Sequence, residues 1–257
     1  MSAAAISSRR HVALTRLIQI AFAASALLIW QLAASLGWVD SLFLATPLAT
    51  ARVFVKTAIL SEPHMAATLS SFALSVVFGV AAALIVGFLI NQSRYTYFVF
   101  LPLLAIGVTI PKVTLLPLFV LWFGIEKSTI VIYGALSAFF PMVLNVSAAS
   151  QEVKPAQITL ARAMGYSGLQ TYRKVILPAM IPVLTSGLFY ACNAALMGVF
   201  IVELVLARYG VGAFIRDLAT TFRTPELYAA IVLVSLITVI INMSLWTLAR
   251  HFSKWRA

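Results

Sequence analysis

The chain has very little charge for its length. Only 10% of its 257 residues are Asp, Glu, Lys or Arg and 62% are hydrophobic, whereas soluble domains have about 25% charged and about 45–50% apolar residues. A water-soluble domain of this size cannot bury so many apolar side chains. The composition therefore excludes an ordinary soluble protein and indicates a chain solvated by a lipid bilayer, where lipid-facing positions are apolar too.

Residues that bind metals or form disulfides are also scarce. The one cysteine, Cys192, lies inside an apolar run, and the three histidines, His11, His64 and His251, are far apart in the sequence. A disulfide framework or a Cys/His metal site needs several such residues at regular spacing. We expect no metal site, and we interpret Cys192 as a small core residue.

A phosphate-binding loop is missing, because the sequence has no G-x-x-x-x-G-K-[ST] pattern. ATP hydrolysis by the mechanism that uses this loop is therefore excluded for this chain. The apolar runs also lack a set of nucleophile, base and metal ligands, which a membrane enzyme would need. We expect a protein that is not an enzyme and binds no cofactor itself.

The formal net charge of +11 raises the alternative of a nucleic-acid-binding protein. The basic residues, however, occur in short clusters between long uncharged runs. This is the pattern of loops that flank membrane spans. We therefore expect the lipid bilayer, and no nucleic acid, to be the partner of these charges.

Six apolar runs are each long enough to cross a hydrocarbon core as a helix, which takes about 20 residues. They cover approximately residues 17–36, 66–90, 98–123, 129–149, 180–202 and 227–249. The first run could instead be an export signal, but it exceeds the roughly 7–15 apolar residues of such signals and lacks a convincing cleavage site. We predict an all-α membrane protein with about six transmembrane helices, the first one retained.

Orientation follows from the distribution of Lys and Arg between the loops. With the N-terminus inside, eleven of these residues fall on the cytoplasmic side and six on the outer side. The acidic residues agree, since most of them fall outside. The sequence therefore predicts a multi-pass protein with both termini in the cytoplasm.

The third apolar run is predicted to be broken. It contains Pro102, Pro111 and Pro117, and proline removes a backbone donor and clashes with the preceding helical turn. A broken helix is tolerated in a bilayer where it packs in protein or lines a wet cavity. Residues 111–117 are therefore a candidate pathway element, and a merely kinked packing helix is the alternative.

Lys112 is the only formal charge inside this run. A lipid-facing charge near the middle of a span costs roughly 2.5–3.5 kcal/mol on insertion scales. We expect Lys112 to face a translocation pathway beside Pro111 and to help draw an anionic solute through it. The alternative is that its long side chain reaches the lipid headgroups.

Other polar residues lie in the spans. Asn145, Asn193 and Asn242 are candidates for solute contact, although an Asn in a bundle more often bonds to a neighbouring helix. Glu203, near the outer end of the fifth run, is predicted to help form an outer gate or to pair with Arg208. The alternative is an interfacial acid that reaches water.

Two outer segments have recognisable patterns. Residues 47–60 place Arg52 and Lys56 among apolar residues, which suits a short helix at the outer interface. Residues 208–226 begin with Gly210 and Gly212 and continue as an apolar–polar mixture. They are predicted to form either a short lid helix or an ordinary connecting loop.

The longest cytoplasmic loop, at about residues 150–178, has the local signals of two short helices. Pro155 suits a first helical turn, and Gly165 suits the left-handed residue that ends a helix. Ser167 can cap a second helix, which Pro178 either ends or joins to the next span. The resulting hairpin would offer the apolar residues Leu160, Ala161 and Met164 to a partner.

This loop resembles the EAA signature of bacterial ABC importer permeases. Matching positions are Ala161, Gly165, Val175, Leu177 and Pro178. Thr159 stands where the motif has Glu, and Leu160 where it has its first Ala. The resemblance implies a loop that docks on a separate ATPase. The implied coupling residues are Thr159, Ala161, Gly165, Tyr172, Val175, Leu177 and Pro178.

Further stretches resemble the nitrate/sulfonate/taurine group of these permeases. They are LLPLFVLWFGIEKS at 115–128, FFPMVLN at 139–145, the segment 64–87, Val202-Glu203 and Gly210-Val211-Gly212. The resemblance implies a type I ABC importer permease fold, with residues 1–257 as one permease domain in the bacterial inner membrane. It also implies a homodimer, a cytoplasmic ATPase dimer carrying ATP and Mg, and an extracytoplasmic solute-binding protein.

A secondary transporter driven by an ion gradient is the alternative function. Such proteins commonly show internal repeats with paired broken helices and intramembrane carboxylates. Here one run is proline-broken, and Glu203 is the sole candidate acid. The sequence therefore favours an importer subunit for a small, anionic solute.

Overall fold

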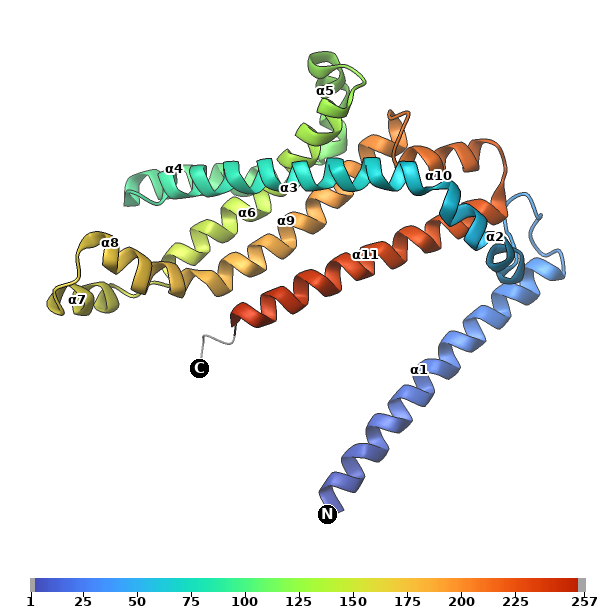
Figure 1. Ribbon diagram of the computed structural model, residues 1–257, viewed down its shortest axis with the longest axis horizontal. Coiled ribbons are helices and arrows are strands. Elements are labelled where there is room, and N and C mark those ends of the chain that lie inside the picture. The colour runs from blue at the N-terminus through green and yellow to red at the C-terminus, as the bar shows by residue number, and fades with distance from the viewer. Residues whose placement is uncertain (1–2, 254–257) are drawn as a thin grey trace. The chain divides into compact units, whose positions relative to one another are not determined.

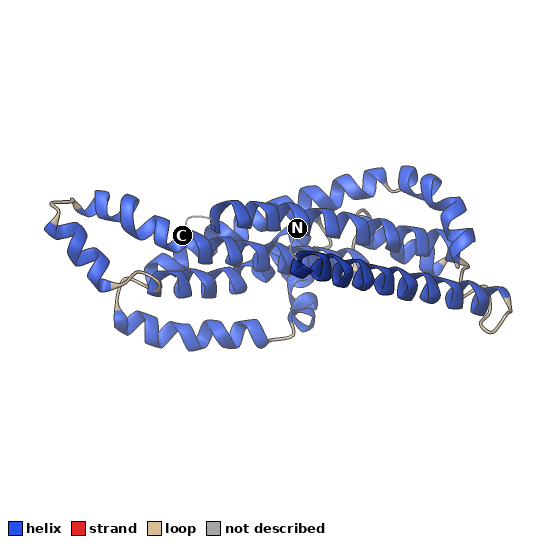
Figure 2. Ribbon diagram, turned by 90° about the horizontal axis from the view of Figure 1, so that it is seen from below, coloured by secondary structure: helices blue, strands red, loops and turns tan. Residues whose placement is uncertain are grey.

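The computed structural model describes the backbone of residues 3–253 and the side chains of residues 14–247. The described backbone consists of helices joined by turns and loops, without a strand (Figure 1, Figure 2). Five of its helices are long and apolar enough to cross a membrane, and a bent helix pair raises the number to six if the pair is one span. The predicted all-α membrane fold with about six transmembrane helices is confirmed.

The chain divides into two compact units. The smaller unit contains residues 3–60 and 217–233, and includes α1 (Ala3–Ser35) and α2 (Pro47–Leu60). The indole of Trp30 donates to the carbonyl of Ala45 at 3.0 Å and its ring lies 5.4 Å from that of Tyr228. The expected short helix at residues 47–60 is present as α2.

Side chains along α1 are mostly exposed and apolar. Leu17, Ile20 and Phe22 are 66%, 69% and 75% exposed. A surface of this kind is stable when hydrocarbon surrounds it, because lipid tails do not penalise apolar side chains. The unit therefore presents α1 as a lipid-facing span.

The larger unit contains residues 61–216 and 234–253, and its core is formed by three long helices. They are α3 (Glu62–Ile90), α6 (Lys127–Gln151) and α9 (Leu177–Val205), with α6 packed against both others (Figure 1). Small residues bring the helices together. A Cβ built at Gly79 would lie 2.5 Å from the carbonyl oxygen of Ala135, and one at Gly187 would lie 2.5 Å from Cβ of Asn145. Such close contacts are typical of membrane helices, where van der Waals packing drives association.

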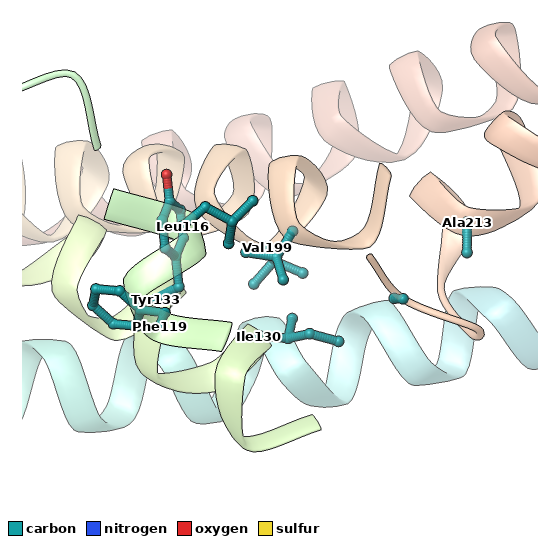
Figure 3. Packing of buried hydrophobic residues seen from close by; sticks show 8 residues of the cluster. Leu116, Phe119, Ile130, Tyr133, Val199 and Ala213 are labelled. Atoms are coloured by element: carbon teal, nitrogen blue, oxygen red, sulfur yellow. The ribbon is translucent and has the colours of Figure 1, made fainter. Parts of the chain in front are cut away.

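The remaining helices of this unit are shorter or cross its boundary. They are α4 (Arg94–Thr109), the 3₁₀ turn Lys112–Leu115, α5 (Leu116–Phe123), α7 (Pro155–Ala163), α8 (Gly168–Thr171), α10 (Val211–Thr220) and α11 (Thr224–Ser253). Of the two alternatives stated for residues 208–226, the short helix is present, as α10. A buried cluster from α5, α6 and α9 includes Leu116, Phe119, Tyr133 and Val199 (Figure 3).

The fifth span continues directly from the preceding loop. Its helix α9 begins at Leu177, close to the expected residue 180, and is part of a continuous helical segment from Gly168 to Val205. Pro178 opens α9 and does not end a separate helix. The π-helical turn Tyr172–Ile176 directly precedes it, and such a turn widens the helix at the position where a proline ring would otherwise clash with the preceding carbonyl.

Candidate functional site

The third span is broken where the sequence predicted. Helix α4 ends at Thr109, and its axis makes an angle of 88° with the segment Lys112–Phe123. Pro111 caps the 3₁₀ turn, and Pro117 lies in the first turn of α5, where its missing N–H leaves no bond unmade. Pro102 stays inside α4. The break therefore lies at residues 110–111, and the alternative of a merely kinked packing helix is excluded.

Lys112 lies beside this break and lines a cavity of about 320 Å³. Its Nζ donates to the carbonyl of Val108 at 3.4 Å and lies 5.6 Å from the centre of the Phe140 ring. The opposite wall comes from α9 and includes Met197 and Gly198. Among the described side chains no carboxylate lies within 4 Å of this ammonium group. Within this part of the chain, no carboxylate therefore neutralises the charge of Lys112.

Glu203 lies in a different setting from the one expected. Its side chain is 1% exposed, and the Thr68 hydroxyl lies 2.9 and 2.8 Å from its two carboxylate oxygens. The amide of Gly212 donates to Oε2 at 3.1 Å, and the amide of Val211 donates to the Thr68 hydroxyl at 2.8 Å. We call Glu203, Thr68 and residues 210–212 the carboxylate cluster.

Two expectations for Glu203 are corrected by this geometry. It does not reach water, because it is buried, and the ion pair with Arg208 is not formed. An ion pair within 4 Å joins Arg223 and Glu226, and Arg208 is not paired with Glu203. A buried carboxylate needs hydrogen-bond donors or a cation. The Thr68 hydroxyl and the Gly212 amide supply the donors to Glu203.

Glycine is required where the carboxylate cluster meets the α9–α10 connection. Gly210 has a φ of +115°, and a Cβ there would lie 2.3 Å from Cδ of Glu203. A Cβ at Gly212 would lie 2.7 Å from the backbone nitrogen of Leu204. The two glycines flanking Val211 therefore let the backbone close over the carboxylate.

The Asn candidates are used within the helix bundle. Asn145 donates to the carbonyl of Pro141 on its own helix at 2.8 Å. Asn193 donates to the carbonyl of Phe189 and to Oδ1 of Asn242 at 2.8 Å, which links α9 with α11. The Asn193–Asn242 bond is the helix-pairing alternative stated for such residues, whereas the Asn145 bond stays within α6. Asn193 and Asn145 are not among the residues that line the Lys112 cavity.

The loop at 150–178 forms the expected helical hairpin. Gly165 has a φ of +78°, and the Tyr166 amide donates to the carbonyl of Ala161 at 3.0 Å, which closes the end of α7. Ser167 caps α8, where its hydroxyl accepts from the Gln170 amide and the Gln170 side chain accepts from the Ser167 amide. We call residues 155–171 the α7–α8 hairpin.

The α7–α8 hairpin exposes apolar side chains. Leu160, Met164 and Leu169 are 62%, 62% and 68% exposed, whereas Ala161 is 3% exposed. The expectation that Ala161 is available to a partner is therefore corrected, since it packs inward. Thr159 is exposed and donates to the carbonyl of Pro155 at 3.1 Å. Tyr172 is 41% and Leu177 37% exposed, Val175 is half-buried, and Pro178 is exposed.

Sequence reasoning missed two residues of these sites, Thr68 and Tyr133. Thr68 is one of many Ser and Thr residues in apolar runs, and nothing local distinguishes it. Tyr133 lines the Lys112 cavity, but a lone Tyr near a helix end is ordinarily an interfacial residue. The described residues contain no group of three His, Cys, Asp or Glu side chains that could hold a metal ion.

Comparison with known families decides the class of protein. Residues 75–257 match the family described as binding-protein-dependent transport system inner membrane component. The chain belongs to this family. It is a multi-pass permease subunit of an ABC importer, and the resemblance noted from the sequence is confirmed.

Named relatives support the assignment over most of the chain. The putative aliphatic sulfonates transport permease protein SsuC of Bacillus subtilis is 29% identical over 89% of this chain and 83% of its own length. The formylaminopyrimidine transport permease protein ThiX of Halalkalibacterium halodurans is 30% identical over 80% of this chain and 84% of its own. The taurine transport system permease protein TauC of Escherichia coli is 25% identical over 89% and 86%.

The fold of this permease also matches a solved structure. An inward-facing structure of the MetNI methionine ABC transporter superposes with a TM-score of 0.64 at 19% identity, over 76% of this chain and 97% of that chain. At this identity the likeness shows the fold alone. The expected type I ABC importer permease fold is therefore confirmed.

Proposed function

We propose that this permease subunit works with a separate ATPase that docks on the α7–α8 hairpin. The observation that carries the proposal is the exposed apolar group of Leu160, Met164 and Leu169 on that hairpin. Exposed side chains of this kind outside the apolar spans are typical of a protein interface. ATP and Mg would be bound by the partner ATPase, and this chain would bind no cofactor.

The hairpin has a direct mechanical connection to the membrane region. The helical segment Gly168–Val205 is 38 residues long and ends beside the carboxylate cluster. A packed helix moves as a rigid element, so a push at Tyr172 would displace the far end of α9 as well. This supports Thr159, Ala161, Gly165, Tyr172, Val175, Leu177 and Pro178 as the coupling residues of the loop, with Ala161 acting through packing.

The transported solute is proposed to be small and anionic. Lys112 beside Pro111 supplies an unpaired positive charge at a helix break, and relatives of this chain are named for aliphatic sulfonates and taurine. One relative is named for formylaminopyrimidine, so the names of the relatives do not agree on one solute class. The proposal of an anionic solute therefore depends on Lys112. Asn145, Asn193 and Glu203 remain pathway or gate candidates that would act through helix packing.

A homodimer with an extracytoplasmic binding protein completes the proposed importer. The family name itself specifies dependence on a binding protein. In a two-fold dimer with Lys112 side chains about 8 Å apart, repulsion at an effective dielectric near 20 would be about 2 kcal/mol. An anion between the two would relieve it. We further propose that residues 1–257 act as one permease domain.

The proposed orientation places both termini in the cytoplasm, because of the excess of Lys and Arg in the corresponding loops. Single cysteines at Ser41 and Thr220, in a Cys192→Ala background, should react with an impermeant thiol reagent added from outside. A cysteine at Ser253 should react only after the membrane is permeabilised. The opposite pattern of labelling would reverse the topology.

Lys112 provides the test of the solute class. Lys112→Arg and Lys112→Gln would be compared in proteoliposomes that contain the ATPase and the binding protein. Arg keeps the charge, so solute-stimulated ATP hydrolysis and uptake should largely remain, whereas Gln should lose both while still assembling. Parental uptake by Lys112→Gln would contradict the anionic-solute proposal. The secondary-transporter alternative would instead be supported by uptake without the ATPase.

A further inference from the structure

A second residue with a polar group, Tyr133, lines the cavity beside Lys112. Tyr133 lies on α6, lines this cavity together with Lys112 and Ser137, and is 1% exposed. Its ring packs against that of Phe119 at 5.6 Å. In Figure 3 the hydroxyl points away from Phe119 and Ile130.

The Tyr133 hydroxyl has no hydrogen-bond partner among the described residues. Burying an unpaired hydroxyl is unfavourable, and most buried side-chain polar atoms are satisfied. The group is not needed for packing, since Phe would fill the same space. An unpaired donor on a residue that lines the same cavity as Lys112 is suited to a ligand that accepts from both side chains.

We propose that Lys112 and Tyr133 form a transient binding site for the oxyanion group of the solute. The inference rests on the proposed function and identifies the solute as a small organic oxyanion, such as a sulfonate or carboxylate. The Lys112 ammonium and the Tyr133 hydroxyl each donate to a solute oxygen, and hydrogen bonds to a charged acceptor are the stronger kind.

The rest of the cavity wall agrees with an organic solute. Val113, Met197 and Ile201 are apolar and face the volume of about 320 Å³, which suits a short carbon chain. The Ser137 hydroxyl donates to the Tyr133 carbonyl at 2.9 Å, so it offers the solute acceptor capacity only. An amino or hydroxyl group on the solute would bond there.

A first experiment removes the hydroxyl alone. Tyr133→Phe and the parent would be compared in proteoliposomes containing the ATPase and binding protein, with taurine, methanesulfonate and nitrate as probes. We expect uptake of the two sulfonates to fall about tenfold, the size of one lost charge-assisted bond. The thermal midpoint of the purified variant should be unchanged or raised, because an unsatisfied buried group has been removed.

The matched control is Tyr228→Phe. The hydroxyl of Tyr228 donates to the carbonyl of Phe43 at 3.3 Å in the smaller unit, and Tyr228 is not among the residues that line the Lys112 cavity. This variant should lower the thermal midpoint slightly and leave uptake at the parental rate. If Tyr133→Phe lowers midpoint and uptake together, its hydroxyl has a structural role and the proposal is overturned. Parental uptake by Tyr133→Phe also overturns it.

A second experiment does not depend on transport. Met197 is 64% exposed, so Met197→Cys in a Cys192→Ala background places a thiol on the cavity wall. We expect an anionic sulfonate-bearing methanethiosulfonate to react faster than a cationic one, and Lys112→Gln to reduce this rate ratio about tenfold. If Lys112→Gln leaves this rate ratio unchanged, the proposed anion site is overturned. If the rate ratio depends on Lys112 but the protein imports none of the probes, the anion site stands and the proposed function is contradicted.

Discussion

Two regions of the larger unit, the carboxylate cluster and the α7–α8 hairpin, contain glycines with positive φ, but they are stabilised in different ways. In the carboxylate cluster, hydrogen bonds connect Glu203 with Thr68, 135 residues away in the chain. In the α7–α8 hairpin, the bonds join residues three to five positions apart. The first region is fixed by tertiary structure, and the second is fixed locally and leaves its apolar side chains exposed.

The largest expected effect is the difference in stability loss between a Gly→Ala substitution in the carboxylate cluster and one in the α7–α8 hairpin. Gly210→Ala combines a positive φ with a Cβ 2.3 Å from Cδ of Glu203, so the carboxylate must move and lose its bonds. We expect the free energy of unfolding to fall by about 2–6 kcal/mol, because of backbone strain and overpacking. Gly165→Ala has a φ of +78° and open space around its Cβ, and its free energy of unfolding should fall by about 1–2 kcal/mol.

Thermal unfolding of both purified variants in the same detergent would measure this difference. Equal losses for Gly210→Ala and Gly165→Ala would mean that the Glu203 contact contributes nothing beyond backbone strain.

A larger side chain at Gly165 should affect assembly more than stability. Gly165→Val places a β-branched residue at a φ of +78°, a genuine outlier by sterics. The turn between α7 and α8 would rearrange and displace Leu160 and Leu169. We expect the permease to insert normally but to co-purify with its ATPase at least about tenfold less, a loss of about 1.4 kcal/mol or more of docking free energy.

The control for this variant is Gly168→Ala. Gly168 begins α8, and a Cβ there meets nothing within 4 Å, so ATPase binding should be retained. Docking that survives Gly165→Val would remove the hairpin from the interface.

A smaller effect is expected from Thr68→Val, which keeps the side-chain shape and removes the hydroxyl. The Glu203 carboxylate and the Val211 amide would each lose a partner while buried, at a cost of about 1–3 kcal/mol. Thr159→Val removes a comparable hydroxyl from the exposed surface of α7, where water replaces the bond to Pro155. Its effect should lie within about 0.5 kcal/mol, and the two midpoints measured side by side would sharpen the contrast.

The sequence predicted the parts of this permease whose causes are local. Pro155, Gly165 and Ser167 specify the α7–α8 hairpin through first-turn, left-handed and capping preferences, and the hairpin forms as expected. Pro111 similarly predicted the break in the third span. Thr68 and Tyr133 were missed, because their roles depend on which residues pack against them and no local pattern carries that information.

The apolar runs by themselves determined that the chain is a helical membrane protein, because in lipid every backbone polar group must be bonded within its own segment or in a closed barrel. Only the tertiary structure decided what the few polar residues in those runs do. Glu203 was expected to help form a gate or to pair with Arg208, with an acid that reaches water as the alternative. Its carboxylate is enclosed by Thr68 and the glycines at 210 and 212, without the Arg208 pair and without exposure to water. Asn193 was a pathway candidate, and it bonds to Asn242. Packing brings these partners together from distant parts of the chain. A single buried hydrogen bond contributes little net free energy and involves few residues, so it changes neither the composition nor the hydrophobic periodicity of the sequence.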